Sequence, residues 1–578
     1  MLDLIIRNGT LVDGTGAAAS RSDVGIRDGR VIAVGQVDEP AQATIDAEGH
    51  VVAPGFVDIH THFDAQVFWD PLLTPSSLHG VTTAIGGNCG FSVAPLVPES
   101  ADYLLRMLSK VEGMPLDALQ NGADWQWGSF GSYLSRLDGS LALNAGFLVG
   151  HSALRRAVMG DRSVGEEATE EETRAMGNLL HRSLAEGGLG FSSSQAGPHF
   201  DGDGKPVPSR FAGRDELLSL AAVVRDHAGT TLEFNPLSGG LITDAQADLM
   251  AAMSIAADRP LNWNVLLADA ANPETARANL RASRTAEKAG GAVFALTLPE
   301  ALQLHLNFAS GFTLETIPLW GDLLALPHDE RRAALTRPEV RARLREGAEG
   351  APQGFNGLLN LERLRIGDVY AEENAAARGR TVADVARQRG GDPFDVLLDI
   401  VVADDLRTEL LPPTLGGTAL EDWRFRREVW RDPAVVLGAS DAGAHLDMLS
   451  TFTYSTRLLG TVTRELGLLS IEEAIHLLTG APARLYGITD RGRLAPGAWA
   501  DVVVFDPVTI EPGPVGTRFD LPGGAGRLYG EAIGIAHVIV NGTPILDHGA
   551  PTGNLPGTVL RSGRDTATVD VAAARRIT

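Results

Sequence analysis

Alternation of apolar and polar residues at both ends of the chain predicts short β-strands. Turns of the Asp-Gly and Glu-Gly type separate the segments near the N-terminus, and segments of the same kind return near the C-terminus. Because isolated short strands are unstable, we expect both chain ends to pair in one small β-sandwich domain, formed by residues 1–53 and 485–578. The alternating segments are 4–12, 23–34, 43–52, 500–506 and 536–546.

Between these ends, short apolar runs alternate with amphipathic helical stretches. This order is typical of a parallel sheet whose strands are joined by helices. Eight such runs can be counted, which is the number of strands in a TIM-type barrel. The sequence therefore predicts an α/β fold with a (β/α)8 barrel over residues 54–484. The runs are 55–60, 81–87, 144–151, 188–193, 230–235, 261–266, 292–297 and 435–441.

One connection is too long for a plain barrel loop. Residues 300–434 separate the seventh run from the eighth, and they contain further helical patterns. Loops of more than about 15 residues without structure of their own are uncommon in compact domains. We therefore expect this insertion before the last barrel strand to form a subdomain or lid over the site.

Composition and charge limit the classes of partner. Of the 578 residues, 44% are hydrophobic and 21% are charged, as in a globular protein. A formal net charge of −24 argues against nucleic acid and anionic membranes, and no apolar run has the length of a membrane span. The N-terminus lacks the features of a signal peptide, so we expect a cytoplasmic protein that acts on a small-molecule substrate. Formation of a homo-oligomer stays open.

Polar residues follow the predicted strands where a barrel carries its chemistry. The first strand ends in His60-Thr-His62, and alternation turns both imidazoles to the same side. The eighth strand ends in Asp441, and Cys89 follows the second within a glycine-rich turn. Alone, a His-x-His pair or a single cysteine is more often structural. Together at strand ends, they indicate a metal site.

Five segments of the chain form a recognisable set of motifs. They are Ala53-Pro-Gly-Phe-Val-Asp-Ile-His-Thr-His, Gly80-Val-Thr-Thr-Ala-Ile-Gly-Gly-Asn-Cys-Gly, Leu148-Val-Gly-His-Ser-Ala-Leu-Arg, Ala439-Ser-Asp and Gly492-Arg-Leu-Ala-Pro-Gly-Ala-Trp-Ala-Asp-Val-Val-Val-Phe. In them the chain resembles the amidohydrolase superfamily, and within it the N-acyl-D-amino-acid deacylase (D-aminoacylase) group. The resemblance covers nearly the whole chain.

The resemblance implies a zinc-dependent hydrolase that cleaves the amide bond of a small N-acylated substrate, an N-acyl-D-amino acid. It also implies that Cys89 replaces the carbamylated lysine ligand of other amidohydrolases, and that Asp441 both contacts metal and acts as general base. The lysines agree with this, because Lys110, Lys205 and Lys288 all lie away from the predicted strand ends.

The chain departs from the family at the ends of the fifth and sixth strands, where the resemblance implies histidine ligands. Glu233 and Asn235 stand at the fifth, and Asn262 and Asn264 at the sixth. Carboxylate is an acceptable zinc ligand, whereas Asn is a poor one. Two outcomes follow. A single zinc is held by His60, His62 and Asp441 with Cys89 near, or Cys89 and Glu233 complete a reshaped site that holds one or two ions.

Four further residues are candidates for binding the substrate. His151 ends the third strand and Arg155 follows it by four residues, where its guanidinium could bind a carboxylate. Asn264 and His445 complete the group. The structural alternatives are a buried network for His151, an ion pair for Arg155 and a plain loop histidine for His445.

Three functional hypotheses remain open from the sequence. The first is a deacylase of N-acyl-D-amino acids that uses metal-activated water. The second is an amidohydrolase that acts on a cyclic amide, imide or carbamate, which the altered ends of strands five and six would allow. The third is a barrel without turnover, against which the joint retention of His60, His62, Cys89 and Asp441 argues.

Overall fold

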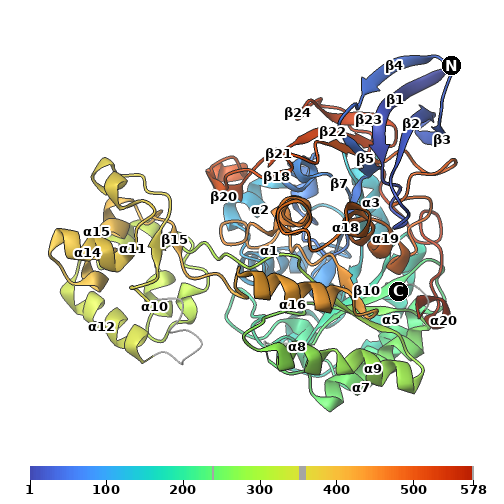
Figure 1. Ribbon diagram of the computed structural model, residues 1–578. Coiled ribbons are helices and arrows are strands. Elements are labelled where there is room, and N and C mark those ends of the chain that lie inside the picture. Colours follow the sequence, from blue (N-terminus) through green and yellow to red (C-terminus); the bar gives the residue numbers. More distant parts are fainter. Residues whose placement is uncertain (237–239, 351–359, 576–578) are drawn as a thin grey trace.

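The computed structural model describes residues 1–236, 240–350 and 360–575 (Figure 1). Strands from both chain ends share one nine-stranded sheet in the order β24-β23-β22-β17-β5-β1-β2-β3, with β4 paired to β1. The two ends meet where β5 runs antiparallel to β17, and every residue of both strands is buried. The strands are β1 (Leu2–Leu11), β2 (Ser20–Arg27), β3 (Arg30–Gly35), β4 (Ala41–Asp46), β5 (Val51–Pro54), β17 (Val502–Phe505), β22 (Ile535–Val540), β23 (Thr543–Asp547) and β24 (Ala550–Pro551).

Each of the eight apolar runs contains strand, and the strands pair in parallel. One ladder has the order β6-β7-β8 and the other β9-β10-β11-β12-β13-β16. Only Leu148 separates β8 from β9, and a parallel bridge between Thr61 and Ala442 links the segments that follow β6 and β16. The strands are β6 (Phe56–Asp58), β7 (Val81–Gly86), β8 (Asn144–Phe147), β9 (Val149–Gly150), β10 (Gly190–Ser194), β11 (Thr231–Asn235), β12 (Leu261–Trp263), β13 (Val293–Thr297) and β16 (Val435–Leu437).

Helices alternate with these strands and give the mixed α/β content that the pattern predicts. Helix α5 shows why: Thr169 and Glu172 form a capping box at its start, and Met176, Leu180 and Leu184 are buried along one face. No helix among the described residues is long and apolar enough to cross a membrane. These helices are α1 (Ala101–Val111), α4 (His151–Met159), α5 (Glu170–Ala185), α6 (Arg214–Val224), α7 (Asp244–Ala257), α9 (Arg281–Ala289), α16 (Leu420–Trp430), α18 (Ile471–Leu478) and α19 (Gly480–Leu485).

The segment between β13 and β16 carries a hydrophobic core of its own. Its buried side chains extend from Leu306 to Leu410 and are joined by Met448. Figure 1 shows its helices in yellow, set apart from the main body. The helices are α10 (Gly321–Leu324), α11 (His328–Ala334), α12 (Pro338–Glu349), α14 (Val382–Arg389) and α15 (Pro393–Ala403).

A buried polar network ties the chain-end sheet to the parallel strands. Asp501, just before β17, forms an ion pair with Arg491, and both side chains are at most 3% exposed. Its carboxylate also accepts hydrogen bonds from the Asn541 backbone N–H (2.8 Å) and from Asn144 Nδ2 (3.1 Å) on β8. Asp501 therefore links the C-terminal part of the chain to β8.

Candidate metal centre

The His-x-His segment lies where the sequence places it, directly after β6. The side chains of His60 and His62 are buried, and their ring centroids are 5.4 Å apart. Thr61, between them, donates to the Ile85 carbonyl and turns away from the pair. The two imidazoles therefore face one point beyond the end of the strand.

Cys89 reaches this point from the turn after β7. Its Sγ lies 3.6 Å from His60 Nε2, and the ligand atoms of His60, His62 and Cys89 all lie within 4.8 Å of one another. The turn needs glycine, because Gly87 has φ 75° and a Cβ there would meet the Leu148 carbonyl oxygen at 2.2 Å. The glycine-rich sequence around the cysteine thus has a steric reason.

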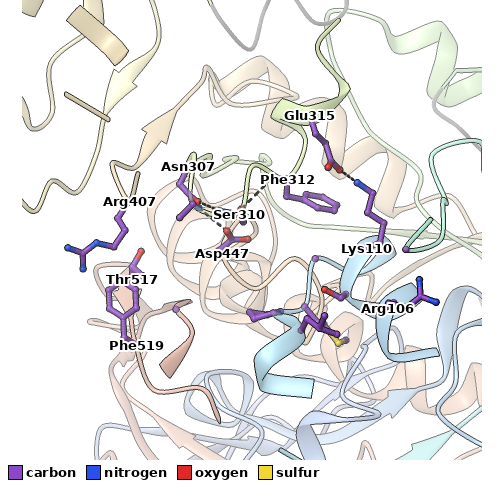
Figure 2. Close-up of a pocket in the computed structure, with 18 of the residues that line it drawn as sticks. Arg106, Lys110, Asn307, Ser310, Phe312, Glu315, Arg407, Asp447, Thr517 and Phe519 are labelled. Carbon is purple, nitrogen blue, oxygen red and sulfur yellow. Dashed lines mark hydrogen bonds and ion pairs between the residues drawn. The ribbon is translucent and has the colours of Figure 1, made fainter. Parts of the chain in front are cut away.

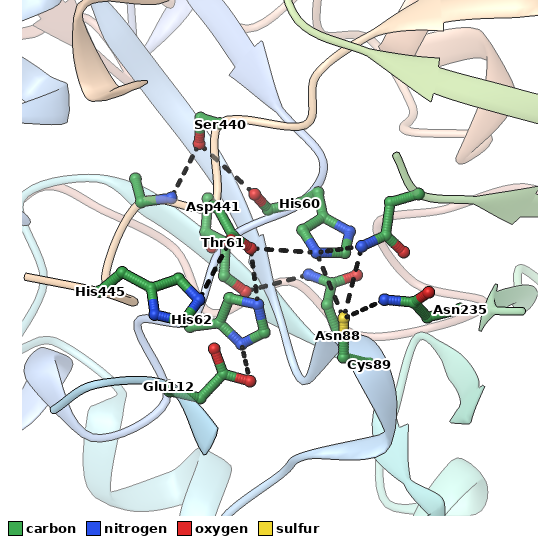
Figure 3. Close-up of polar contacts among 12 residues, drawn as sticks. His60, Thr61, His62, Asn88, Cys89, Glu112, Asn235, Ser440, Asp441 and His445 are labelled. Atoms are coloured by element: carbon green, nitrogen blue, oxygen red, sulfur yellow. Dashed lines mark hydrogen bonds and ion pairs between the residues drawn. The ribbon is translucent and has the colours of Figure 1, made fainter. Parts of the chain in front are cut away.

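Asp441 closes the cluster from the segment after β16 (Figure 3). Its Oδ1 lies 3.0 Å from His62 Nε2 and 3.5 Å from His60 Nε2, and its backbone N–H donates to the His60 carbonyl. The side chain is 29% exposed, whereas those of His60 and His62 are at most 2% exposed. His445 Nε2 lies 3.7 Å from Asp441 Oδ2. Asp441 is thus the acid of the cluster that solvent and substrate can reach.

Buried carboxyl groups surround the two histidines. Burial raises the pKa of Glu112 to about 7, that of Glu233 to about 8 and that of Asp64 to about 6. Burial lowers the pKa of His62, but Glu112 and Asp441 outweigh it and raise that pKa well above its usual value. Two imidazoles, one thiol and a neighbouring carboxylate are a donor set that fits a divalent metal.

Besides His60, two carboxamides lie next to the sulfur of Cys89. Asn264 Nδ2 lies 3.5 Å and Asn235 Nδ2 3.7 Å from Sγ, so both amides donate toward the sulfur. Glu233 uses Oε2 to accept the Cys89 backbone N–H at 2.8 Å, and among the described residues its Oε1 has no hydrogen-bond partner. Its role as a metal ligand stays a prediction.

His151 and Arg155 belong to a buried network beside the cluster. His151 contacts Ser193 Oγ (2.9 Å) and Glu216 Oε1 (2.8 Å), and the Arg155 guanidinium donates to both Glu216 oxygens and to the Glu166 carbonyl. Both side chains are fully buried. These contacts favour the structural alternatives for the pair, and their role in binding a substrate stays a prediction.

Glu112 is a member of the site that the sequence analysis missed. It follows helix α1, its Oε1 lies 3.5 Å from His62 Nδ1, and its carbonyl accepts the His445 backbone N–H. The carboxylate thus faces the second ring nitrogen of His62 without a hydrogen bond, in a position from which it can orient the ring. Nothing in the sequence distinguishes Glu112 from a surface acid at a helix end.

A cavity of about 550 Å³ lies near His445, although none of His60, His62, Cys89, Asp441 and His445 lines it (Figure 2). Helix α1 supplies Lys110 to its wall, the segment after β13 supplies Phe312 and Glu315, and the C-terminal part supplies Phe519. Lys110 and Glu315 form an ion pair across it, and the Phe312 ring packs 5.0 Å from the His445 ring. The volume is typical of a small-molecule site.

Comparisons with known proteins agree with this geometry. The profile of the Amidohydrolase family matches residues 43–545. The N-acyl-D-glutamate deacylase of Alcaligenes xylosoxydans xylosoxydans is 30% identical over 97% of this chain and 96% of its own, and the D-aminoacylase of the same organism is 28% identical over 96% and 97%. The crystal structure of N-acyl-D-glutamate deacylase from Bordetella bronchiseptica, complexed with zinc and a phosphonate inhibitor, superimposes with a TM-score of 0.63 at 26% identity, covering 97% of this chain and 100% of that one. The chain belongs to the amidohydrolase family.

Proposed function

We propose that this protein is a metal-dependent hydrolase that cleaves the amide bond of a small N-acyl-D-amino acid. The observation that carries the proposal is the cluster of His60, His62 and Cys89 with the accessible carboxylate of Asp441 beside it. The relatives named as deacylases of N-acyl-D-amino acids, which align over nearly their whole length, support this substrate class.

We infer that the eight parallel strands close into a TIM-type barrel over residues 54–484. The bridge between Thr61 and Ala442 supports closure, because it links the segments after the first and the last strand. Residues 1–53 and 485–578 then form the β domain. Within the insertion 300–434, the separate core from Leu306 to Leu410 supports an independent lid, whereas α16 packs into the main core.

The site fits one zinc ion, held by His60, His62 and Cys89 with Asp441 at its open side. Zinc bound there would polarise the amide carbonyl and lower the pKa of water. Asn235 and Asn264 support a single ion, because their amide nitrogens point at Sγ and the carboxamide is a poor zinc ligand.

Asp441 is the group best placed to move the proton during hydrolysis. Burial raises its pKa, but hydrogen bonds from His60 and His62 outweigh this and hold the pKa well below the usual range, so the side chain is a carboxylate. It can take a proton from the attacking water and deliver it to the leaving amine. His445 contacts the same side chain, with its Nε2 3.7 Å from Asp441 Oδ2.

The test combines metal content with turnover on the same preparations. Wild type should contain about one zinc per chain and release amino acid from N-acetyl-D-amino acids but not from their L-enantiomers. His62→Asn should lose both properties. His328→Asn, a change at an exposed histidine of the lid, should retain both.

Three results would contradict the proposal. If His62→Asn left the zinc content unchanged, the metal would not be bound at this site. Turnover of a cyclic amide, imide or carbamate in place of the acyl amino acids would favour the alternative substrate class, which the carboxamides at strands five and six leave open. Full metal content without turnover of either class would indicate a barrel that binds but does not react.

A further inference from the structure

A second cluster of metal-ligating side chains lies on the edge of the chain-end sheet. In the part of the chain that the structure describes, two groups of such residues bring their ligand atoms within 4.8 Å of one another. One is the centre of His60, His62 and Cys89. The other consists of His537, Asp547 and His548, on the hairpin of β22 and β23.

The backbone of this hairpin places the three side chains together. His537 and Asp547 are direct partners across the antiparallel strands. A two-residue turn of His548 and Gly549 follows and returns the chain to β24. Both turn residues are left-handed, with φ 47° and 75°, as a type I′ turn requires. His548 therefore stands at the first position of the turn, directly after Asp547.

The ligand atoms converge on one point. His537 Nδ1 lies 3.0 Å and His548 Nε2 3.9 Å from Asp547 Oδ1, and the two rings are 4.8 Å apart. The short approach of His537 Nδ1 to Asp547 does not have the geometry of a hydrogen bond. Converging lone pairs at such distances are typical of ligands that share one ion.

We propose that His537, Asp547 and His548 form a second binding site for a divalent transition metal, of the zinc class. Two imidazoles and one carboxylate suit zinc, whereas calcium and magnesium prefer all-oxygen sites. The sheet fixes one ligand, because His537 is 5% exposed, while Asp547 and His548 stand open to solvent. Three protein ligands leave a coordination position for water, so the site binds more weakly than a closed structural site.

An ion pair between His537 and Asp547 is the competing explanation. An ion pair involves His537 and Asp547 alone, whereas a metal site also uses His548, whose ring lies 4.8 Å from that of His537. A neutral imidazole is the form that binds metal. The proposal is independent of the proposed catalytic function, because the two clusters share no residue.

Cobalt binding can be measured at the two sites separately. Protein stripped with a chelator is dialysed against Co²⁺ and analysed for metal, while the thiolate-to-cobalt charge-transfer band reports only the centre that contains Cys89. The variants are His548→Asn, which suits the left-handed turn, and Asp547→Asn. The control is His328→Asn, another exposed histidine outside the cluster.

We expect wild type and His328→Asn to bind one equivalent of cobalt beyond the amount that the thiolate band accounts for. His548→Asn and Asp547→Asn should lose that equivalent while the thiolate band keeps its intensity. Equal metal content in all four proteins would overturn the proposal. A loss in His328→Asn as large as that in His548→Asn would overturn it as well, because binding would then not depend on this cluster.

Discussion

Replacing Glu112 by Gln tests whether a buried carboxylate orients His62, a proposed metal ligand. In wild type, Glu112 Oε1 lies 3.5 Å from His62 Nδ1, and both side chains are at most 4% exposed. The change keeps the size of the side chain and removes its negative charge. We therefore expect the fold to persist and the affinity for zinc to fall.

The geometry sets the scale of this effect. Two unit charges 3.5 Å apart interact by about 5 kcal/mol at an effective dielectric constant of 20. The imidazole of a metal ligand carries only part of a charge, and glutamine keeps a dipole that can accept a hydrogen bond. A loss of about 10- to 100-fold in metal affinity, equivalent to about 1.4–2.8 kcal/mol, is the expected result, and it agrees with the effect of removing such outer carboxylates.

Competition with a chromophoric chelator measures the zinc affinity of each protein. Glu300→Gln is the matched control, because Glu300 is also buried, with a pKa that burial raises to about 7, but it contacts Thr453 and Arg457 and no member of the metal cluster. Its zinc affinity should equal that of wild type. An affinity of Glu112→Gln within twofold of Glu300→Gln would refute the orienting role of Glu112.

Three further changes test the proposed general base, the buried ion pair of Asp501 and a buried histidine. Asp441→Asn should lower kcat by about 10²- to 10⁴-fold, and KM should change far less, as steady-state kinetics on an N-acetyl-D-amino acid would show; an unchanged kcat would exclude it as general base. Asp501→Ala leaves Arg491 buried without its partner and should lower the free energy of unfolding, measured with denaturant, by about 3–5 kcal/mol. The control is Asp124→Ala, because Asp124 pairs with Arg136 and the two side chains are 38–47% exposed; it should lower the free energy of unfolding by less than about 1 kcal/mol. Equal costs would contradict the reasoning. Burial lowers the pKa of His79 from 6.5 to about 4. Below pH 6.5 the unfolded chain therefore binds a proton that the folded chain does not, so the free energy of unfolding decreases as the pH is lowered. From pH 7 to pH 5 wild type should lose about 2 kcal/mol more unfolding free energy than His79→Gln, and parallel losses would show that His79 is not the group responsible.

The strands and the core of the site could be predicted because they depend on local pattern. Apolar runs mark strands that are buried on both faces, and side chains two residues apart share a direction. His60, His62, Cys89 and Asp441 all follow such runs directly, so their meeting at one end of the strands follows from parallel order alone.

Glu112 and the roles of Asn235 and Asn264 could not be predicted in the same way. Glu112 reaches His62 from the end of a helix, through a fold of the chain that no periodicity encodes. The two asparagines could be placed at strand ends, but which end of each amide turns to Cys89 depends on contacts in three dimensions. Sequence pattern gives the strand on which a residue lies, and packing decides its partner.

The backbone conformation at the cluster indicates that contacts within the protein, and not the metal, position the proposed ligands. Cys89, Asp441 and His445 are all left-handed, with φ of 53°, 58° and 48°, although such residues lose about 1–2 kcal/mol each in this conformation. The backbone N–H of each is held by another member of the site: Glu233 accepts that of Cys89, the His60 carbonyl that of Asp441 and the Glu112 carbonyl that of His445. Strain persists only where the surrounding contacts fix it. Because these contacts lie within the protein, the arrangement of ligands should form before metal binds.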